Sequence, residues 1–462
     1  NTSAASDVYK RQALTRCGEI DNGIAALNHG REAAASVQNK SRALADEAVL
    51  QQIRIDLAIA ENRLKNGELL KAWNIIKNAI DILVGMMGGI GYKERPILDM
   101  SEVLIEFVFA HRLWEREPAK VMQWLKRIIS ICDHRIKERD DTLAKKTYAS
   151  SLIWASRIAL ELKNQKQAME WLNEVESILP SLGEKFLWLS EYWHAMSVEI
   201  YLLKADVYAT MGNMTNSYEQ TNQALAVIQR WNLAENVTYR ALAARTRIIG
   251  GIALSRMERL EEASVWLSAG ILLAEEALDN DPKDTNKSLE IRALIGDAYH
   301  EMARIAFHKR DMNRVIEMAK LGIEQRLSLI DIAENQALHL DISELYMLLL
   351  EALPKDDVDT IYDATSHAVA IVLSACSYSP ANRNRCTLLA EGLYRFAVNA
   401  AKTMNTLNAN GILVWALSLY PLIKNTDLIE QAQTICSEIE ICLLYTSPSP
   451  RDLSTSRMPS SA

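Results

Sequence analysis

The stretch that decides the fold is AENRLKNGELLKAWNIIKNAI, residues 60–80. It contains the end of one apolar helical pattern, an Asn-Gly turn and a second helical pattern in which Ala72 precedes Ile76 by one turn. Positions equivalent to Ile76 recur at intervals of 46 to 52 residues, each with a small or apolar residue four positions earlier: Leu125, Leu172, Thr221, Leu267, Ala319, Ala368 and Leu417. A period of this size predicts a stacked array of helical repeats.

Each repeat is predicted to be a first helix, a short turn and a second helix, because apolar residues recur at helical spacing on both sides of the turn. The predicted pairs are 44–66 with 69–84, 101–115 with 118–136, 143–163 with 165–179, 186–211 with 214–231, 237–257 with 260–279, 286–309 with 311–329, 334–353 with 357–376, and 383–404 with 409–424. Glycine and proline separate the helices, as at Gly67, Pro118 and Pro180. No stretch shows sustained alternation of period two, so we expect no sheet.

Small residues mark the predicted crossing of the two helices in most pairs. Twelve positions before the Ala72-type residues stand Ala60, Ala205, Ala303, Ala352 and Ala401. Small side chains let antiparallel helices approach closely. Together with a glycine near the turn, as at Gly67, and a proline after the second helix, as at Pro180, this pattern resembles the tetratricopeptide repeat. The resemblance covers 44–424 and implies an all-α, right-handed solenoid of about eight antiparallel helix pairs, with a period of about 48 residues in place of the standard 34.

Composition limits the possible classes of function. The 462 residues are 49% hydrophobic and 24% charged, with a formal net charge of −8, which disfavours direct nucleic-acid binding. The longest apolar run, residues 82–90, is about half as long as a membrane helix, so we expect no membrane partner. The 6 cysteines form no Cys-x-x-Cys pair, and we therefore expect free, mostly buried thiols in an intracellular compartment, cytoplasmic or nuclear.

The two ends of the sequence differ from the repeats. Residues 1–12 and 442–462 resemble translated sequencing-adapter read-through, and the last 17 residues are rich in Ser, Pro and Arg without a period. We exclude both ends from the fold prediction. The expected organisation is then a partial repeat helix over 13–43, the repeat array over 44–424 and a truncated next-repeat helix over 425–441. We expect the chain to be a fragment of a longer protein.

Sequence motifs for catalysis, metal binding or cofactor binding are not found. The glycine-rich stretch 85–93 follows a helix and lacks Gly-Lys-Ser/Thr, so we expect a connector between repeats and not a phosphate loop. His300 and His308 lie two turns apart without further candidate ligands, and no Gly-x-Ser-x-Gly elbow occurs. We therefore expect no catalytic residue, no metal site and no cofactor.

Two kinds of residue are candidates for partner binding. In arrays of the tetratricopeptide type, the second and ninth positions of the first helices often face the inner surface, and here they include Arg245, Arg304, Arg395 and Lys402. Five arginines within one repeat could pair with an acidic partner segment or could form a solvated helix face: Arg240, Arg245, Arg247, Arg256 and Arg259. The aromatic segment 186–193, with Trp188 and Trp193, is either an exposed anchor for a partner or a wider buried interface between the third and fourth repeats.

These features favour a non-catalytic scaffold that binds protein or peptide segments on the inner surface of the array. One alternative is the sensor region of a larger signalling or transcriptional regulator whose effector domain lies outside this sequence. A second alternative is a meiotic crossover scaffold, because Trp-Leu recurs in the second helices at 124–125, 171–172 and 266–267, and this pattern resembles that family of scaffolds. The sequence does not identify the partner or the oligomeric state.

Overall fold

The computed structural model describes eleven segments of the chain. They are residues 42–65, 68–87, 94–110, 113–115, 117–139, 142–185, 190–279, 286–330, 336–378, 383–401 and 406–423. The predicted segments 1–12, 425–441 and 442–462, and nearly all of 13–43, lie outside these residues. Within the described part of the chain, every regular element is helical, so the prediction of an all-α fold is confirmed.

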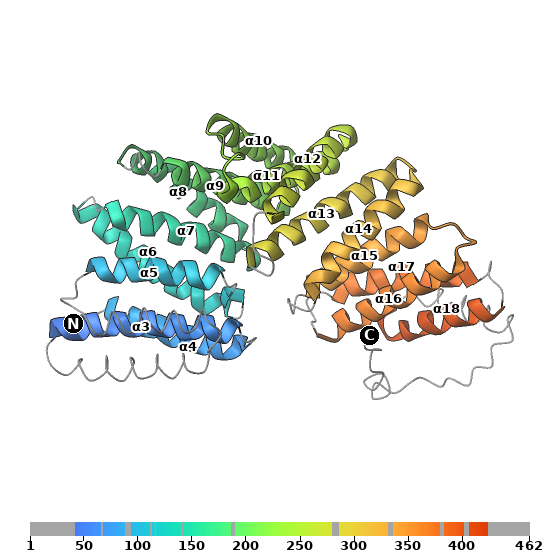
Figure 1. The fold of residues 1–462 in the computed structure, drawn as a ribbon, viewed down its shortest axis with the longest axis horizontal. Coiled ribbons are helices and arrows are strands. Elements are labelled where there is room, and N and C mark those ends of the chain that lie inside the picture. The colour runs from blue at the N-terminus through green and yellow to red at the C-terminus, as the bar shows by residue number, and fades with distance from the viewer. Residues whose placement is uncertain are drawn as a thin grey trace. The chain divides into compact units, whose positions relative to one another are not determined.

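Sixteen α-helices form eight consecutive pairs in the segments that the structure describes (Figure 1). The first helices of the pairs are α3 (Arg42–Lys65), α5 (Glu94–Ala110), α7 (Thr142–Glu161), α9 (Ser190–Thr210), α11 (Val237–Arg256), α13 (Asn286–His308), α15 (Gln336–Ala352) and α17 (Arg383–Ala401). The second helices are α4 (Leu69–Met87), α6 (Pro118–Arg139), α8 (Gln165–Lys185), α10 (Met214–Arg230), α12 (Leu260–Asp279), α14 (Met312–Ile330), α16 (Val358–Tyr378) and α18 (Thr406–Ser418). Short 3₁₀ helices are η1 (Leu113–Glu115) and η4 (Tyr420–Leu422).

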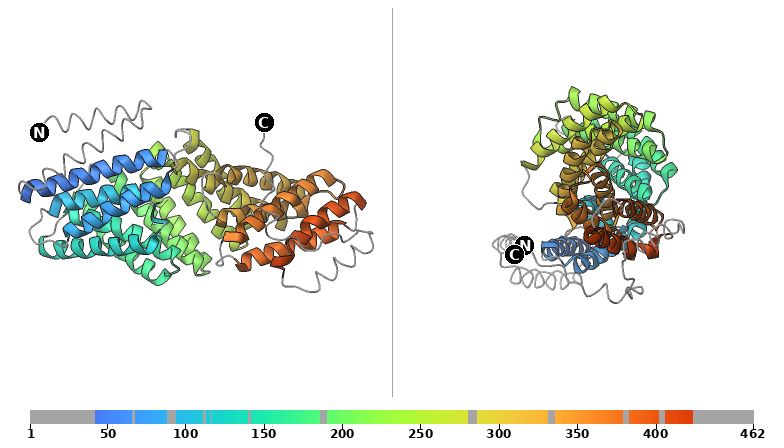
Figure 2. Two further views of the ribbon diagram at one scale, coloured as in Figure 1. Left: turned by 90° about the horizontal axis from the view of Figure 1, so that it is seen from below. Right: turned by 90° about the vertical axis from the view of Figure 1, so that its right-hand side faces the viewer.

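The chain divides into two compact units, Asn1–Ile249 and Gly250–Ala462, here called unit 1 and unit 2. Within unit 1, most helices pack against the next along the chain, as α6 does on α7 and α9 on α10. Figure 2 shows the helical layers from two further sides. Within unit 2, α13, α14, α15 and α16 pack in the same sequential way. This nearest-neighbour packing is what a repeat array requires.

The turn inside a repeat has a recurring local structure. After α7, Lys163 has a φ of 59°, and the Asn164 N–H donates back to the Ala159 carbonyl at 2.8 Å. This hydrogen bond closes the end of the helix in the manner of a Schellman motif. The Asn164 side chain then accepts from the Gln167 N–H at 3.2 Å and caps α8. Left-handed residues recur at the equivalent turns: Gly212, Glu258 and Arg310.

The residues that define the repeat are buried at the helix crossings. Ala72, Ile76 and Ala79 have no exposed surface, and neither do the equivalent residues Leu125, Leu172 and Leu267. At the crossing of α11 and α12, a Cβ added to Gly251 would lie 2.7 Å from Leu267 Cγ. Close approach at this point therefore depends on a small residue, as the sequence pattern predicts.

Two of the predicted helix boundaries that differ in the structure lie near prolines. The helix predicted over 101–115 is α5, Glu94–Ala110, which starts earlier because Pro96 lies in its first turn, where no intrahelical N–H bond is needed. Pro180 was expected to end a helix, but it lies inside α8, which continues to Lys185.

Cysteine chemistry also differs from the prediction in part. Cys132 is free and buried, as expected. Cys386 on α17 is disulfide-bonded, so the expectation that all thiols are free is wrong at this position. None of the helices in the described segments is both long and apolar enough to cross a membrane.

Candidate functional site

The first helices in the middle of each unit present a half-buried face. Away from their end turns, α7 and α9 in unit 1 and α13 and α15 in unit 2 have no exposed residue among those described except Glu290 near the start of α13. The second helices α10 and α12 instead carry exposed residues along their whole length. The side of the first helices that does not pack into the core is therefore partly shielded, and we call it the first-helix face. A shielded polar face holds its side chains in fewer orientations than an open one does.

Four charged residues from three first helices meet on the first-helix face of unit 1. Arg245 on α11 donates to Glu199 Oε1 on α9 at 3.0 Å and to Asp206 Oδ2 at 3.2 Å. Arg157 on α7 also pairs with Glu199. We call these four residues the unit 1 charge cluster. Their side chains are 17% to 36% exposed, so they are oriented by their neighbours and still reach solvent.

Aromatic rings hold one end of the unit 1 charge cluster. The Arg157 guanidinium lies over the Trp154 ring, with 4.4 Å from Cζ to the ring centroid. Trp154 also contacts Phe109 of α5, and the two rings stack with 3.9 Å between their centroids. A cation over an aromatic face is stabilised by the ring quadrupole, so Arg157 is fixed by both Trp154 and Glu199. Side chains from α5, α7, α9 and α11 thus form one continuous series.

The carboxyl group of Asp206 has a raised pKa. Burial is the largest cause, because it disfavours the charged form, while Arg245 and Arg157 act in the opposite direction. The two arginines therefore offset only part of the increase in pKa that burial causes. The Asp206 carboxyl group is therefore harder to ionise than a solvent-exposed aspartate.

Unit 2 contains a second group of paired charges. Arg326 on α14 is only 3% exposed and donates to Asp297 of α13 at 2.5 Å and to Asp341 of α15 at 2.6 Å. Arg385 on α17 pairs with Asp341 and donates from Nε to Glu344 Oε1 at 2.8 Å. We call these five residues the unit 2 charge cluster. It connects four helices by alternating positive and negative groups, which offsets the desolvation of each.

Two neighbouring residues shape the unit 2 charge cluster. A Cβ on Gly296 would lie 2.8 Å from Arg326 Cγ, so a glycine leaves the room that the buried arginine occupies. His300 Nε2 lies 3.7 Å from Glu344 Oε2, and burial together with Arg326 lowers the pKa of His300 to about 3. His300 is therefore neutral at pH 7 and adds no charge to the cluster.

A third contact in unit 2 involves a predicted site residue. Arg304 donates to Glu301 Oε2 at 3.1 Å within α13, and the Ser255 hydroxyl donates to Glu301 Oε1 at 2.6 Å. Arg256 Nε is 3.8 Å from the same carboxylate. Glu301 is thus surrounded by three donors, and Arg304 helps to satisfy its buried charge.

The predicted candidate residues have different environments in the structure. Arg245 belongs to the unit 1 charge cluster, Arg247 is half-buried on α11, and Arg395 is exposed on α17. Trp188 and Lys402 lie outside the described residues. Trp193 is 3% exposed and belongs to the core of unit 1. For Trp193 the alternative of an exposed anchor is wrong, because its ring packs in the core beside Tyr192.

The arginine patch around α11 does not converge on one open site. Arg259 forms two hydrogen bonds with Glu262, and Arg240 donates to the backbone carbonyl of Ala234. Arg256 and Arg245 face the carboxylates already described. The idea that these arginines together await an acidic partner is therefore not supported, because intramolecular acceptors already occupy four of them.

The charge clusters were missed in the sequence, although a signal was present. Glu199 and Arg245 are 46 positions apart, Ser255 and Glu301 are also 46 apart, and Asp341 and Arg385 are 44 apart. Each separation is about one repeat, so opposite charges or donors at equivalent positions of adjacent repeats come together. Reading the sequence for complementary residues one period apart would have found them.

Other candidate sites in the described residues are few. No group of three or more His, Cys, Asp or Glu gathers as a metal site in the segments that the structure covers. A shallow hollow of about 450 Å³ lies between the start of α8 and the end of α9, with Met169, Tyr208 and Met211 in its wall. Another missed feature is Trp231, which is 43% exposed and stacks on His194 at 3.8 Å.

Comparisons with known proteins give similarity at low sequence identity. No family model matches the chain, and no curated protein matches it. The apo form of RapI is similar over 94% of this chain and 98% of its own, at 11% identity and a TM-score of 0.48. BtubC (BKLC) from P. vanneervenii matches 57% of this chain and 93% of its own, at 14% identity and a TM-score of 0.42.

A third similar structure is a signal transduction ATPase with numerous domains and a tetratricopeptide repeat sensor, from Pyrococcus horikoshii. It matches 83% of this chain and 55% of its own, at 13% identity and a TM-score of 0.43. Similarities at this level carry no argument about function. The function is therefore argued from the surface of this chain.

Proposed function

We propose that this protein is a non-catalytic scaffold that binds extended segments of partner proteins along its first-helix faces. The observation that carries the proposal is the unit 1 charge cluster. It brings Arg157, Glu199, Asp206 and Arg245 from three successive first helices onto one partly shielded surface. Oriented side chains of this kind lose little freedom when a ligand arrives, which favours binding.

The spacing of the helices suits an extended chain. Packed helices lie about 8–10 Å apart, and an extended chain advances about 3.3 Å per residue. Each repeat would then meet about three residues of a partner segment, since the two distances have that ratio. The three first helices that supply the unit 1 charge cluster would read a segment of roughly six to nine residues on this spacing.

The charges indicate which segment would fit. Two cations and two anions make the unit 1 charge cluster neutral in formal charge, and Glu199 already accepts from Arg157 and Arg245. A purely acidic segment would have to compete with Glu199 and Asp206 for the arginines. We therefore propose a partner segment of mixed charge, whose acidic groups meet the arginines while its basic groups meet the carboxylates.

The experiment compares partner binding by matched variants of the full chain. A partner is first captured from source cells by crosslinking, purified and titrated against the chain. Arg245→Gln should weaken this binding at least fivefold, because it removes the guanidinium that joins Glu199 to Asp206. The control is Lys137→Gln on the second helix α6, whose side chain is 73% exposed and pairs with Asp133. Helical content and melting temperature are checked for both.

Two further results decide the matter. Arg245→Lys keeps the charge but loses the forked geometry, so it should bind with intermediate strength if the guanidinium contacts the partner. If Arg245→Gln and Lys137→Gln bind the partner with the affinity of the parent chain, the unit 1 charge cluster holds repeats together and is not a binding surface.

A further inference from the structure

A second surface lies on α12 of unit 2, on the second-helix side. Helix α12 has the sequence LEEASVWLSAGILLAEEALD, which contains five acidic residues and no basic residue. Its core side is formed by Ala263, Leu267, Gly270, Ile271, Ala274 and Ala277. Yet Val265 is 67% exposed and Leu272 is 58% exposed. These two aliphatic side chains therefore add little to the core.

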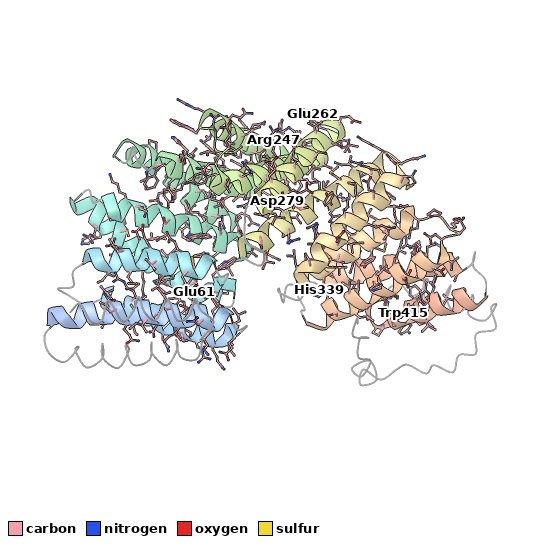
Figure 3. All side chains as sticks on the ribbon, in the orientation of Figure 1. Glu61, Arg247, Glu262, Asp279, His339 and Trp415 are labelled. Carbon is pink, nitrogen blue, oxygen red and sulfur yellow. The ribbon has the colours of Figure 1, made fainter. Side chains whose placement is uncertain are left out.

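Val265 and Leu272 share one stripe of α12. They are seven residues apart, which is two turns or about 10.5 Å along the axis. Acidic residues lie on the same exposed side at both ends of this stripe: Glu261, Glu262, Glu275, Glu276 and Asp279. Glu262 and Asp279, labelled in Figure 3, mark the two ends of the helix. An apolar centre with a charged border is the usual composition of an interaction surface.

The other repeats show that this stripe is unusual for the array. At the position of Val265, five other second helices place an exposed polar residue: Asn74, Gln123, Glu170, Glu219 and Glu317. At the position of Leu272, five place an exposed polar or small residue: Asp81, Ser130, Ser177, Ala226 and Glu324. In α16 both positions are half-buried, and in the last repeat they are half-buried residues of α18 and of η4. Exposed aliphatic residues at both positions thus occur, among the described second helices, in α12 alone.

The charge around the stripe defines the chemistry of a ligand. Lys309 pairs with Glu261 at 2.8 Å and Arg259 pairs with Glu262 at 2.5 Å. These neighbours pair with two of the five carboxylates, while α12 itself supplies five acidic residues and no basic residue to this side of the unit. Exposed ion pairs of this kind are weak and can be exchanged for pairs with a partner. A second copy of this face would be repelled, because α12 contains no cation.

We propose that the exposed face of α12 binds a basic amphipathic helix of a partner protein. Two apolar side chains of that helix cover Val265 and Leu272, while Lys or Arg residues on either side meet the acidic ends of α12. The stripe from Glu261 to Asp279 is about 27 Å long, which matches a partner helix of about 18 residues. This surface is distinct from the first-helix face, so each of the two proposals can fail alone.

The test uses synthetic helical peptides of about 18 residues and the full chain. The first peptide has two Leu residues seven positions apart, flanked by Lys on an Ala background. The second replaces every Lys by Glu, and the third replaces both Leu by Ser. Binding is measured by fluorescence anisotropy at a salt concentration of about 0.15 M. The Lys-Leu peptide should bind at least tenfold more tightly than either of the others.

Variants of the chain then locate the binding site. The double variant Val265→Gln/Leu272→Gln should weaken the Lys-Leu peptide tenfold or more without changing the melting temperature, because both side chains are exposed. Leu70→Gln on α4 is the matched control, since Leu70 is 65% exposed, and it should bind like the parent chain. Glu275→Gln/Glu276→Gln/Asp279→Asn should reduce both the affinity and its dependence on salt.

Three results would overturn the proposal. One is equal binding of the Lys-Leu and Glu peptides. Another is an unchanged affinity of the Val265→Gln/Leu272→Gln variant for the Lys-Leu peptide. The third is a sedimentation experiment in which the parent chain self-associates and this variant does not, because a second copy would then occupy the face.

Discussion

The crossing of α11 and α12 gives a prediction in which two known effects oppose each other. Replacing Gly251 by Ala in a helix should stabilise it by about 1 kcal/mol, because glycine has the larger backbone entropy to lose. In this structure the added Cβ would lie 2.7 Å from Leu267 Cγ, 2.9 Å from Cδ2 and 3.2 Å from the backbone nitrogen of Leu267. Rotation of the Leu267 side chain cannot relieve the backbone contact. The two helices must therefore move apart.

Overpacking of a filled core typically costs about 1–3 kcal/mol, so we expect Gly251→Ala to destabilise unit 2 by a net amount of about 1–2 kcal/mol. Gly85 on α4 is the matched control, because a Cβ there would meet nothing within 4 Å. Gly85→Ala should stabilise its helix by up to about 1 kcal/mol. The opposite signs of the two changes separate packing from helix propensity.

The assay is hydrogen exchange on peptides from α11 and α12, together with urea unfolding of the full chain. Local exchange is needed because a chain with two compact units need not unfold in one step. In a Leu267→Ala background the contacts with Cγ and Cδ2 are absent and only the 3.2 Å backbone contact remains, so Gly251→Ala should cost much less there than in the parent chain. A coupling energy of about 0.5–3 kcal/mol between the two substitutions would support the close crossing. Stabilisation by Gly251→Ala alone, as large as that of Gly85→Ala, would refute it.

Three further predictions concern the turns and one buried histidine. Gly212→Ala should lower the unfolding free energy by about 1–2 kcal/mol, because Gly212 has a φ of 76° and open space around it, and thermal melting checks this. Arg310→Gly should raise the stability by up to about 1 kcal/mol, since Arg310 has a φ of 59°; no gain in the melt would contradict a strained turn. His300→Gln should reduce the loss of stability between pH 6.5 and pH 3, because the pKa of His300 falls from 6.5 to about 3 on folding. Below pH 6.5 the unfolded chain takes up a proton that the folded chain does not, so acid favours unfolding, and urea midpoints at pH 7 and pH 5 measure the difference.

The period of the apolar residues was sufficient to predict the helical array. Ile76 and its equivalents as far as Ala368 are buried because a residue at the centre of each second helix must face its own first helix, and this requirement repeats with the fold. Helix boundaries were less predictable. Pro96 is compatible with the first turn of α5, so the helix begins at Glu94, whereas the sequence predicted a helix that begins at residue 101.

The candidate site was predicted less well than the fold. The sequence predicted Arg245 as an inner-surface residue, but its pairing with Glu199 and Asp206 depends on how adjacent repeats are aligned. The period of the apolar residues does not determine how adjacent repeats are aligned. Oppositely charged residues about one repeat apart do indicate that alignment. Trp193 was a candidate for partner binding but is a core residue. A large aromatic side chain in an apolar segment can lie in the core or on the surface, and the sequence alone does not distinguish the two.

The exposed pair on α12 shows what internal comparison adds to a single sequence. Val265 and Leu272 fit an ordinary helical pattern when α12 is considered alone. Their exposure becomes informative only when the equivalent positions of other repeats prove to be polar. A repeat protein thus contains its own reference set, and deviations from it can be tested by substitution toward the residues of its other repeats.

The most direct test of binding on the first-helix face is hydrogen exchange of the full chain with and without a captured partner. We predict that the partner slows exchange in α7, α9 and α11 around the unit 1 charge cluster, and that Arg245→Gln abolishes this protection. Protection confined to the second helices α8 and α10, with no change in α7, α9 or α11, would contradict the proposal that the first-helix face binds partners.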